Sequence, residues 1–304
     1  MTRLFAFALG AIMALTTTAH AEGRQRLGYG RLITNDLIGD TYDRWRTGTY
    51  ASSRVWGPEW QGQAPDGFGQ LLEFRFNGEI IAPENLAGPS PVDRPYVGAL
   101  SFGLHTHFQP QQIDYAVGAD LVVTGPQTGL DDFQDFVHDV LGGRKISPQV
   151  RRQQLGNNVF PRLVVEAGRE FEVGRAHIRP FGEARLGVED MIRAGADISF
   201  GRVGQGELMI REPTTGQRYR VVQNPFKGYA FVVGGDIAYV DRSEYLPASS
   251  GIVLTEERAR VRAGLHWENA TGTNAFYGLT WLSEEFETQR RGQFVGSVRL
   301  RLQF

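Results

Sequence analysis

Apolar and polar residues alternate over segments of about ten residues at many places in this sequence, and this pattern restricts its fold more than any other feature. In the last seven residues the alternation puts Val298, Leu300, Leu302 and Phe304 on one face of a strand and Arg299, Arg301 and Gln303 on the other. The same pattern recurs at 177–189, 227–241 and 257–270. Segments with one apolar face and one polar or small face are typical of a transmembrane β-barrel with a wet interior.

Twelve such segments can be marked along the chain. They cover 26–36, 44–57, 69–81, 96–108, 111–124, 159–173, 177–189, 192–204, 227–241, 257–270, 273–287 and 290–304. An even number lets an antiparallel barrel close with both chain ends on one side. The sequence therefore predicts an all-β fold, a twelve-stranded antiparallel transmembrane β-barrel. A secreted β-sandwich or lipocalin-like barrel is the alternative, but it does not require charged residues opposite apolar ones in so many segments.

The beginning of the chain predicts export. Arg3 precedes an apolar run from Leu4 to Leu15, and an Ala-x-Ala pattern ends at Ala21. These are the parts of a secretory signal peptide, so we expect cleavage after residue 21 and a barrel domain at 22–304 in the bacterial outer membrane. The apolar run is shorter than the roughly 17 to 25 residues that a spanning helix needs. The chain has no cysteine, which excludes thiol catalysis and cysteine-ligated metals.

The charged residues restrict the partners. The formal net charge of −2 disfavours a nucleic-acid binder, which usually carries a basic excess. Lys145 and Lys227 are the only lysines. Nearly all positive charge is therefore carried by arginine, whose planar guanidinium group forms paired hydrogen bonds with carboxylate or phosphate. We expect inward-facing arginines to pair with lumenal Asp and Glu, as at Arg260, Arg262, Arg299 and Arg301, and some rim arginines could instead bind lipid phosphates.

The longest predicted outward loop, 125–158, contains a helical pattern. Thr128 to Asp131 resembles a capping box, and apolar residues then recur at helical spacing until Gly142. We expect a short helix in an extracellular loop, with Gln134 and His138 on the same face. The connection at 205–226 is assigned to the periplasmic side. It is either a hairpin around 213–216 or a sign that a strand has been miscounted.

Two clusters of polar residues are candidates for chemistry. The stretch NDLIGDTYDRWRTG (35–48) would lie at the same rim as the helix, and its oxygen-bearing side chains suit a hard cation such as calcium. The same residue types also make ordinary turns, and composition alone favours that interpretation. His105 and His107 share one face of the fourth segment, where polar packing in the lumen is more probable than a metal site.

An ordered set of motifs extends over most of the mature chain. They are ND at 35–36, DRWRTG at 43–48, APENLAGPSPVDRPYVG at 82–98, TGPQTG at 124–129, FQDFVHDVLGG at 133–143, QLGNN at 154–158 and LTWLSEEFETQ at 279–289. In order and spacing the set resembles the outer-membrane lipid A 3′-O-deacylase (LpxR) family. The resemblance implies a barrel that hydrolyses the 3′-linked acyloxyacyl ester of lipid A, within lipopolysaccharide of the outer leaflet, in a reaction that depends on Ca2+. We expect a monomer.

The resemblance also implies site residues. Asn35 and Asp36 match the active-site Asn-Asp pair of the family, Thr47 its threonine before glycine, and Gln134 and His138 its Gln-x-x-x-His. His138 would then be the general base. Calcium held around Asn35 and Asp36 would polarise the ester carbonyl, and Gln134 and Thr47 would orient water or substrate.

The sequence departs from the family pattern in three places. Arg46, Thr47 and Gly48 replace the usual Tyr-Thr-Asn-Gly, Arg144 takes the place of an acid six residues after the histidine, and 82–95 contains no lysine. Asp139 could orient His138 instead, and Arg94 could supply the charge of the missing lysine. Two alternatives stay open: a phospholipase-type barrel, and a catalytically inactive structural or lipid-binding barrel of the same family.

Overall fold

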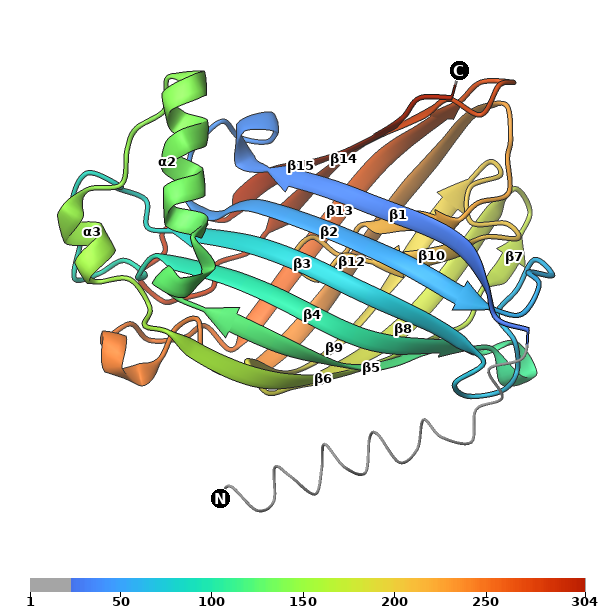
Figure 1. Ribbon diagram of the computed structural model, residues 1–304, viewed down its shortest axis with the longest axis horizontal. Helices are drawn as coiled ribbons and strands as arrows, with labels where there is room; N and C mark the ends of the chain where they lie inside the picture. The colour runs from blue at the N-terminus through green and yellow to red at the C-terminus, as the bar shows by residue number, and fades with distance from the viewer. Residues whose placement is uncertain (1–22, 304) are drawn as a thin grey trace, which may run out of the picture.

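Antiparallel strands form a closed barrel wall in the computed structural model, which describes residues 23–303 (Figure 1). The predicted signal peptide lies outside the described residues. The wall strands are β1 (Gln25–Asn35), β2 (Trp45–Gly57), β3 (Leu71–Ala82), β4 (Val97–Phe108), β5 (Asp114–Thr124), β6 (Asn158–Gly168), β8 (Ala176–Leu186), β9 (Glu189–Phe200), β12 (Gly228–Ser243), β13 (Glu257–Glu268), β14 (Asn274–Leu282) and β15 (Gln293–Arg301). The predicted twelve-stranded barrel is confirmed.

Each wall strand pairs with its neighbours in the chain, and the pairing of β6 with β8 closes the circle. The short β7 (Phe171–Val173) pairs with β8 and continues the line of β6. The single segment predicted at 159–173 is therefore interrupted before β7. In β13 the inward Arg260 and Arg262 are buried, whereas the outward Val261 is exposed. An outward apolar surface of this kind is what lipid requires.

The two ends of the barrel differ. Several turns at the end that carries the C-terminus are short, as at 109–113 and 174–175, whereas the opposite end carries the longest connection, 125–157, with its helices (Figure 1). Bacterial barrels have short periplasmic turns and longer extracellular loops, so we call these ends periplasmic and outer. Within residues 23–303, no helix has both the length and the apolar character to cross a bilayer.

Residues 205–226 form a hairpin, one of the two predicted alternatives, but it lies inside the barrel. Its strands are β10 (Leu208–Arg211) and β11 (Arg218–Val222). A Cβ on Gly28 of β1 would lie 2.1 Å from the carbonyl oxygen of Val221, so glycine is needed for β11 to approach the wall. At the hairpin tip, the Thr214 hydroxyl donates to Glu79 Oε1 over 2.8 Å.

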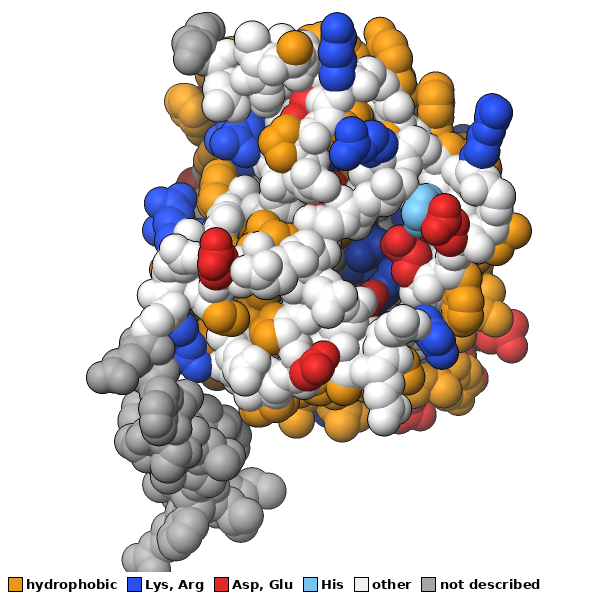
Figure 2. All heavy atoms as spheres, turned by 90° about the vertical axis from the view of Figure 1, so that its right-hand side faces the viewer, with side chains coloured by type: hydrophobic (Ala, Val, Ile, Leu, Met, Phe, Trp, Pro, Cys, Tyr) orange, Lys and Arg blue, Asp and Glu red, His pale blue; other side chains and the backbone are white. Residues whose placement is uncertain are grey.

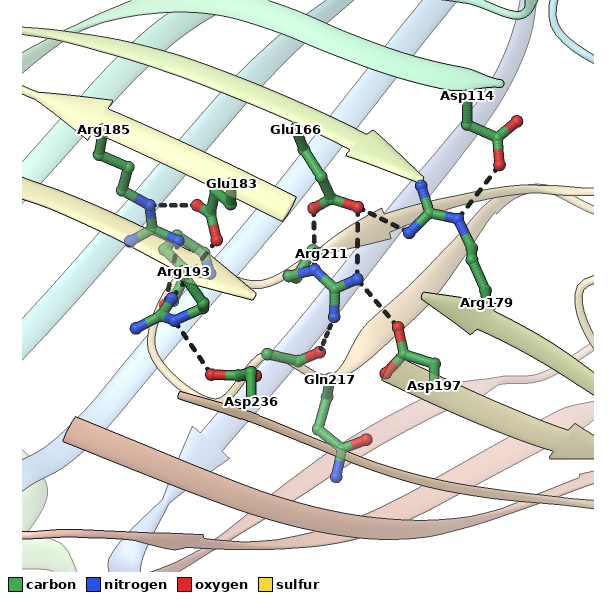
Figure 3. A network of polar contacts seen from close by, with 12 residues as sticks. Asp114, Glu166, Arg179, Glu183, Arg185, Arg193, Asp197, Arg211, Gln217 and Asp236 are labelled. Atoms are coloured by element: carbon green, nitrogen blue, oxygen red, sulfur yellow. Dashed lines mark hydrogen bonds and ion pairs between the residues drawn. The ribbon is translucent and has the colours of Figure 1, made fainter. Parts of the chain in front are cut away.

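Ion pairs fix this hairpin in the lumen (Figure 3). Arg211 Nε lies 2.8 Å from Glu166 Oε2, and its Nη2 lies 2.9 Å from Asp197 Oδ2. Asp236 receives Arg260 and Arg262 at 2.9 and 2.5 Å, which confirms the pairing predicted for these two arginines. Buried charges are tolerated when they are paired in this way.

The remaining lumen is polar and partly hollow. His105 Nε2 lies 3.0 Å from Asp120 Oδ1 and His107 Nε2 lies 2.6 Å from Glu73 Oε2, so both histidines take part in the predicted lumenal packing. A cavity of about 240 Å³ lies beside them. Figure 2 looks onto the periplasmic end, where basic side chains are visible inside a hollow in the surface.

At the outer end, α2 (Leu130–Leu141) stands across the ends of the wall strands, and α3 (Pro148–Arg152) follows it (Figure 1). The predicted helix exists, but the predicted capping box is wrong. Its N-cap is Gly129, with φ of +66°, and no side chain caps it; Thr128 ends the preceding 3-10 turn η3 (Pro126–Thr128). The left-handed backbone at this position suits glycine rather than a capping threonine.

Candidate active site at the outer rim

The Asn-Asp pair turns the chain at the end of β1. Asn35 is the last residue of that strand and caps the 3-10 turn η1 (Asp36–Ile38), where its Oδ1 accepts from the Leu37 amide at 2.8 Å. Asp36 turns inward and is 2% exposed. Its Oδ2 accepts from the Arg44 amide at 2.9 Å, so the carboxylate holds the two ends of the loop together.

Asp36 lacks a cationic partner. The ion pairs of this rim use Asp40, Glu84 and Asp43, and within residues 23–303 Asp36 takes part in none. Burial raises the pKa of Asp36 to about 8, the Arg44 amide opposes that rise, and the nearby Asp43 charge adds to it. A buried carboxylate beside other carboxylates is the environment that a bound cation would stabilise.

Asp43 is the centre of the site. Its Oδ1 accepts from the Thr47 hydroxyl at 2.6 Å and from Gln134 Nε2 at 3.1 Å. Its Oδ2 lies 3.1 Å from His138 Nε2. The structure therefore joins the β1–β2 loop, the start of β2 and the buried face of α2 through one carboxylate. Three of the residues singled out from sequence, Thr47, Gln134 and His138, meet there, and Asp36 lies beside them.

Asp43 was not among the residues singled out from the sequence. It is the first residue of the DRWRTG motif, which was recognised, but only Thr47 was carried over from it. Its position four residues before Thr47 could have signalled the contact. The loop is strained here, because Thr41 and Trp45 on either side have φ of +68° and +52°. Non-glycine residues held in this region often mark functional sites.

The imidazole of His138 is fixed from both sides. Its Nδ1 lies 2.6 Å from the main-chain oxygen of Arg144, to which the Nδ1–H donates. Gly142 ends α2 with φ of +77°, and Gly143 passes so close that a Cβ there would lie 2.7 Å from His138 Cγ. The two glycines thus bring the Arg144 carbonyl to the ring. The main-chain oxygen of Arg144 therefore orients His138, at the position where the family carries an acidic side chain.

Two sequence-based substitutes for missing family residues do not act as predicted. Asp139 does not orient His138: it pairs with Lys145 at 2.8 Å on the exposed side of the helix. Arg94 does not present its charge at the rim, because its side chain is fully buried and bound to Glu285. Arg46, at the position before Thr47, joins the same buried network and contacts Glu79 and Glu285, each at 2.7 Å.

The donor atoms at the site suit a hard cation. Within residues 23–303, no group of three or more His, Cys, Asp or Glu side chains is arranged to hold a metal ion. Any cation would therefore take part of its ligands from amide or main-chain oxygens, which calcium accepts readily. Gln134 Oε1 is buried and has no hydrogen-bond partner among residues 23–303, while Nε2 of the same side chain donates to Asp43.

Exposed apolar side chains flank the site on two sides. On η1, Leu37 and Ile38 are exposed, and the turn lies against the outward face of β15, where a Cβ on Gly296 would be 2.1 Å from the Ile38 oxygen. Tyr277, an outward residue of β14, donates to that oxygen over 2.9 Å. The η1 turn therefore folds over the lipid-facing side of the wall.

Helix α2 is inverted in polarity. Asp131 and Gln134 are its buried residues. Four of its six apolar residues point away from the protein, with exposures of 55% for Phe133, 64% for Phe136, 68% for Val140 and 64% for Leu141. A helix on a soluble protein buries its apolar stripe and exposes its polar one. The reversed arrangement fits a helix whose outer face is covered by lipid.

Comparison with known proteins gives a consistent result. A family model described as outer membrane protein LpxR matches residues 4–304. Among solved structures, LpxR from Salmonella typhimurium superposes with a TM-score of 0.68 at 16% identity, covering 91% of this chain and 100% of that one. The β domain of the Bordetella autotransporter BrkA gives a TM-score of 0.41 at 11% identity, over 91% and 99% of the chains. No curated protein sequence matches the chain.

Proposed function

This chain belongs to the LpxR family of outer membrane proteins, and from this premise we propose that it is a calcium-dependent lipid A deacylase. Its substrate would be lipid A within lipopolysaccharide, and the bond hydrolysed would be the ester of the 3′-linked acyloxyacyl group. The observation that carries the proposal is the meeting of His138, Thr47 and Gln134 at Asp43, on a rim flanked by exposed apolar segments.

The surroundings of the site support a lipid substrate. An ester of lipid A lies just below the headgroups of the outer leaflet, at the depth where a rim site meets the membrane. Exposed apolar residues lie on η1, the turn that contains Asp36, and on α2, the helix that carries His138, so acyl chains could approach without leaving an apolar environment. A monomer suffices, because all the proposed site residues belong to one barrel.

His138 is the proposed general base. With its Nδ1–H donated to the Arg144 carbonyl, Nε2 is the nitrogen that can take a proton from water. Asp43 Oδ2 occupies the space in front of Nε2, so it must turn aside when water and substrate enter. The water oxygen then attacks the ester carbonyl carbon. The carbon–oxygen bond to the sugar breaks, and the proton passes from Nε2 to the leaving sugar oxygen.

The oxygen donors beside His138 are the proposed cation ligands. Asp36 and Asn35 would hold Ca2+ together with the Gln134 amide oxygen, and Thr47 would orient the water. When bound, Ca2+ would polarise the ester carbonyl and stabilise the negative charge on its oxygen. Asn35 Oδ1 already accepts from the Leu37 amide but retains a second lone pair for this purpose.

The test is expression in a bacterium whose lipid A keeps all its acyl chains. Mass spectrometry of extracted lipid A should show loss of the 3′-linked acyloxyacyl group with the wild type and no loss with His138→Ala. Phospholipids from the same cells separate the phospholipase alternative, since lysophospholipid would accumulate in that case. If wild type and His138→Ala leave both lipid classes intact when calcium is supplied, the barrel is a structural or lipid-binding member of the family.

A further inference from the structure

The first and last wall strands pair over only part of their length. β1 and β15 are joined at Ile33–Val298, Thr34–Ser297 and Asn35–Gly296, all near the outer end. By contrast, β1 pairs with β2 from Gln25 to Asn35. Toward the periplasmic end β1 and β15 diverge (Figure 1). The barrel therefore has a seam that is closed in its outer half and open in its periplasmic half.

The lumenal hairpin explains why the seam opens. Gly28 and Gly30 present no side chain to the lumen, and β11 packs directly on them through Val221. In its periplasmic half β1 therefore packs against the hairpin instead of pairing with β15. Strand edges with unpaired amide and carbonyl groups are costly beside lipid. A ligand that satisfies polar groups at this edge would remove part of that cost.

The open half of the seam is a cleft of about 970 Å³. The two strand edges contribute apolar residues to it, including Leu27, Leu300 and Leu302. They also contribute four arginines, Arg26, Arg31, Arg299 and Arg301. The cleft thus combines an apolar wall with a concentration of positive charge, and it lies at the end of the barrel opposite His138.

None of the four arginines takes part in an ion pair within the described part of the chain, although Glu207 and Glu268 lie near Arg299. Glu268, the acidic residue of the cleft lining, is already bound to Arg220 at 2.5 Å. Arg31 Nη2 reaches the Leu300 carbonyl at 3.4 Å, across the cleft. The expectation that Arg299 and Arg301 pair with lumenal carboxylates is therefore wrong, whereas it holds for Arg260 and Arg262.

We propose that this seam cleft binds an anionic phospholipid of the periplasmic leaflet, with the phosphate among the four arginines and an acyl chain along the outer edge of β15. Guanidinium groups bind phosphate through paired hydrogen bonds, and basic pockets beside the hydrocarbon layer suit anionic headgroups. The apolar residues in the cleft favour a lipid over a free anion. This site is separate from the proposed deacylase site and would exist whether or not the barrel hydrolyses lipid A.

Native mass spectrometry of the full mature chain in detergent tests the proposal. The protein is titrated with phosphatidylglycerol, with phosphatidylcholine and with inorganic phosphate. The test variant is Arg31→Gln with Arg301→Gln, whose side chains are exposed. The matched control is Arg54→Gln, an exposed arginine of β2 outside the cleft. A further variant, Arg31→Lys with Arg301→Lys, keeps the charge, and heat-modified gel migration shows whether each barrel has folded.

We expect phosphatidylglycerol to bind about tenfold more tightly than phosphatidylcholine, and the double Gln variant to lose that preference. The Lys variant should keep most of it, and Arg54→Gln should behave as the wild type. Equal binding of the two lipids, or undiminished phosphatidylglycerol binding by a folded double Gln variant, would overturn the proposal. Inorganic phosphate binding as tightly as phosphatidylglycerol would also overturn it, because the site would then be one for a free anion.

Discussion

At the scale of single residues, sequence motifs can identify the side chains of the site. They cannot show which of these side chains contact one another. The motif resemblance pointed to Asn35, Asp36, Thr47, Gln134 and His138, and the structure places all five at one rim. Asp43 could not be singled out in this way, since its role follows from three contacts with residues up to 95 positions away in the chain. Such convergence is a property of the folded chain rather than of any local pattern.

Asp43→Asn should abolish most activity while leaving the barrel folded. The amide lacks the negative charge that lies near Asp36 and the proposed cation, so we expect a loss on the order of a hundredfold or more in the deacylation rate. The rate on purified lipid A is the measurement. The control is Asp139→Asn, which changes a carboxylate next to His138 that does not contact Asp43. This variant should retain the wild-type rate. Full activity in Asp43→Asn would show that this carboxylate is not needed.

Arg144→Ala should keep activity within about twofold, because His138 is held by the main-chain oxygen of residue 144 rather than by its side chain. Gly143→Val should be strongly impaired, because its side chain would press on the imidazole. Steady-state rates of the two variants, with folding checked by heat-modified gel migration, test this pair. The reverse ranking would contradict the proposed support of His138.

Asp36 predicts a pH effect on stability. Because burial raises the pKa of Asp36 from its ordinary value of 3.8 to about 8, its contribution to stability is complete below pH 4 and is lost as the pH rises toward 8. In a calcium chelator, Asp36→Asn should therefore be more stable than the wild type at pH 9, by about 2–4 kcal/mol, and not at pH 4. Thermal unfolding of both proteins measures this.

Added calcium should remove the advantage of Asp36→Asn at pH 9, because a bound cation would stabilise the wild-type carboxylate. A variant that is no more stable than the wild type at pH 9 without calcium would mean that Asp36 is not a destabilised buried carboxylate. An advantage that persists unchanged in calcium would argue against a cation at this residue.

At the scale of elements, the sequence predicted that α2 exists but not which way it faces. Helical periodicity reports an apolar stripe, and that stripe normally points to the core. Here the stripe with Phe133, Phe136 and Val140 points outward, because lipid rather than protein can cover it. The hairpin of β10 and β11 was one of two predicted alternatives, but its position in the lumen was not predicted. Four or five residues of alternation cannot distinguish a lumenal hairpin from a periplasmic one.

Phe136→Ser should impair hydrolysis of lipid A in membranes more than in detergent micelles. Removing the ring from the lipid-facing stripe costs about 2 kcal/mol of apolar burial, which would weaken the seating of α2 in a bilayer by roughly tenfold or more. Micelles adapt to the changed surface. Parallel assays in outer-membrane vesicles and in detergent measure the difference, with Asp132→Asn, an exposed polar residue of the same helix, as control. Equal losses in the two media would count against a membrane-facing α2.

At the scale of the whole molecule, strand number and order could be predicted from alternation because each wall strand must present one face to lipid and one to the lumen. The structure that fills the lumen could not be predicted from this alternation. The hairpin between β9 and β12 occupies the interior through Arg211, Glu166 and Asp197, three residues far apart in sequence. The open seam follows from that filling, and no strand pattern encodes it.

Arg211→Ala should destabilise the barrel strongly. It would remove the buried arginine that joins Glu166 to Asp197 and leave Arg179 and Arg262 as their remaining partners; breaking buried pairs of this kind typically costs about 3–5 kcal/mol. The temperature of barrel unfolding should fall clearly, whereas Arg54→Ala, an exposed position, should change it little. Unfolding of Arg211→Ala at the wild-type temperature would show that the hairpin does not stabilise the wall.

Hydrolysis of a lipid A ester by water at the His138 site is tested most directly by a reaction of the purified protein with lipid A in ¹⁸O-labelled water with calcium. We expect release of the 3′-linked acyl group with one ¹⁸O atom in its carboxyl group, and no release by His138→Ala or in the presence of a chelator. Release without the label, or equal release by His138→Ala, would contradict it.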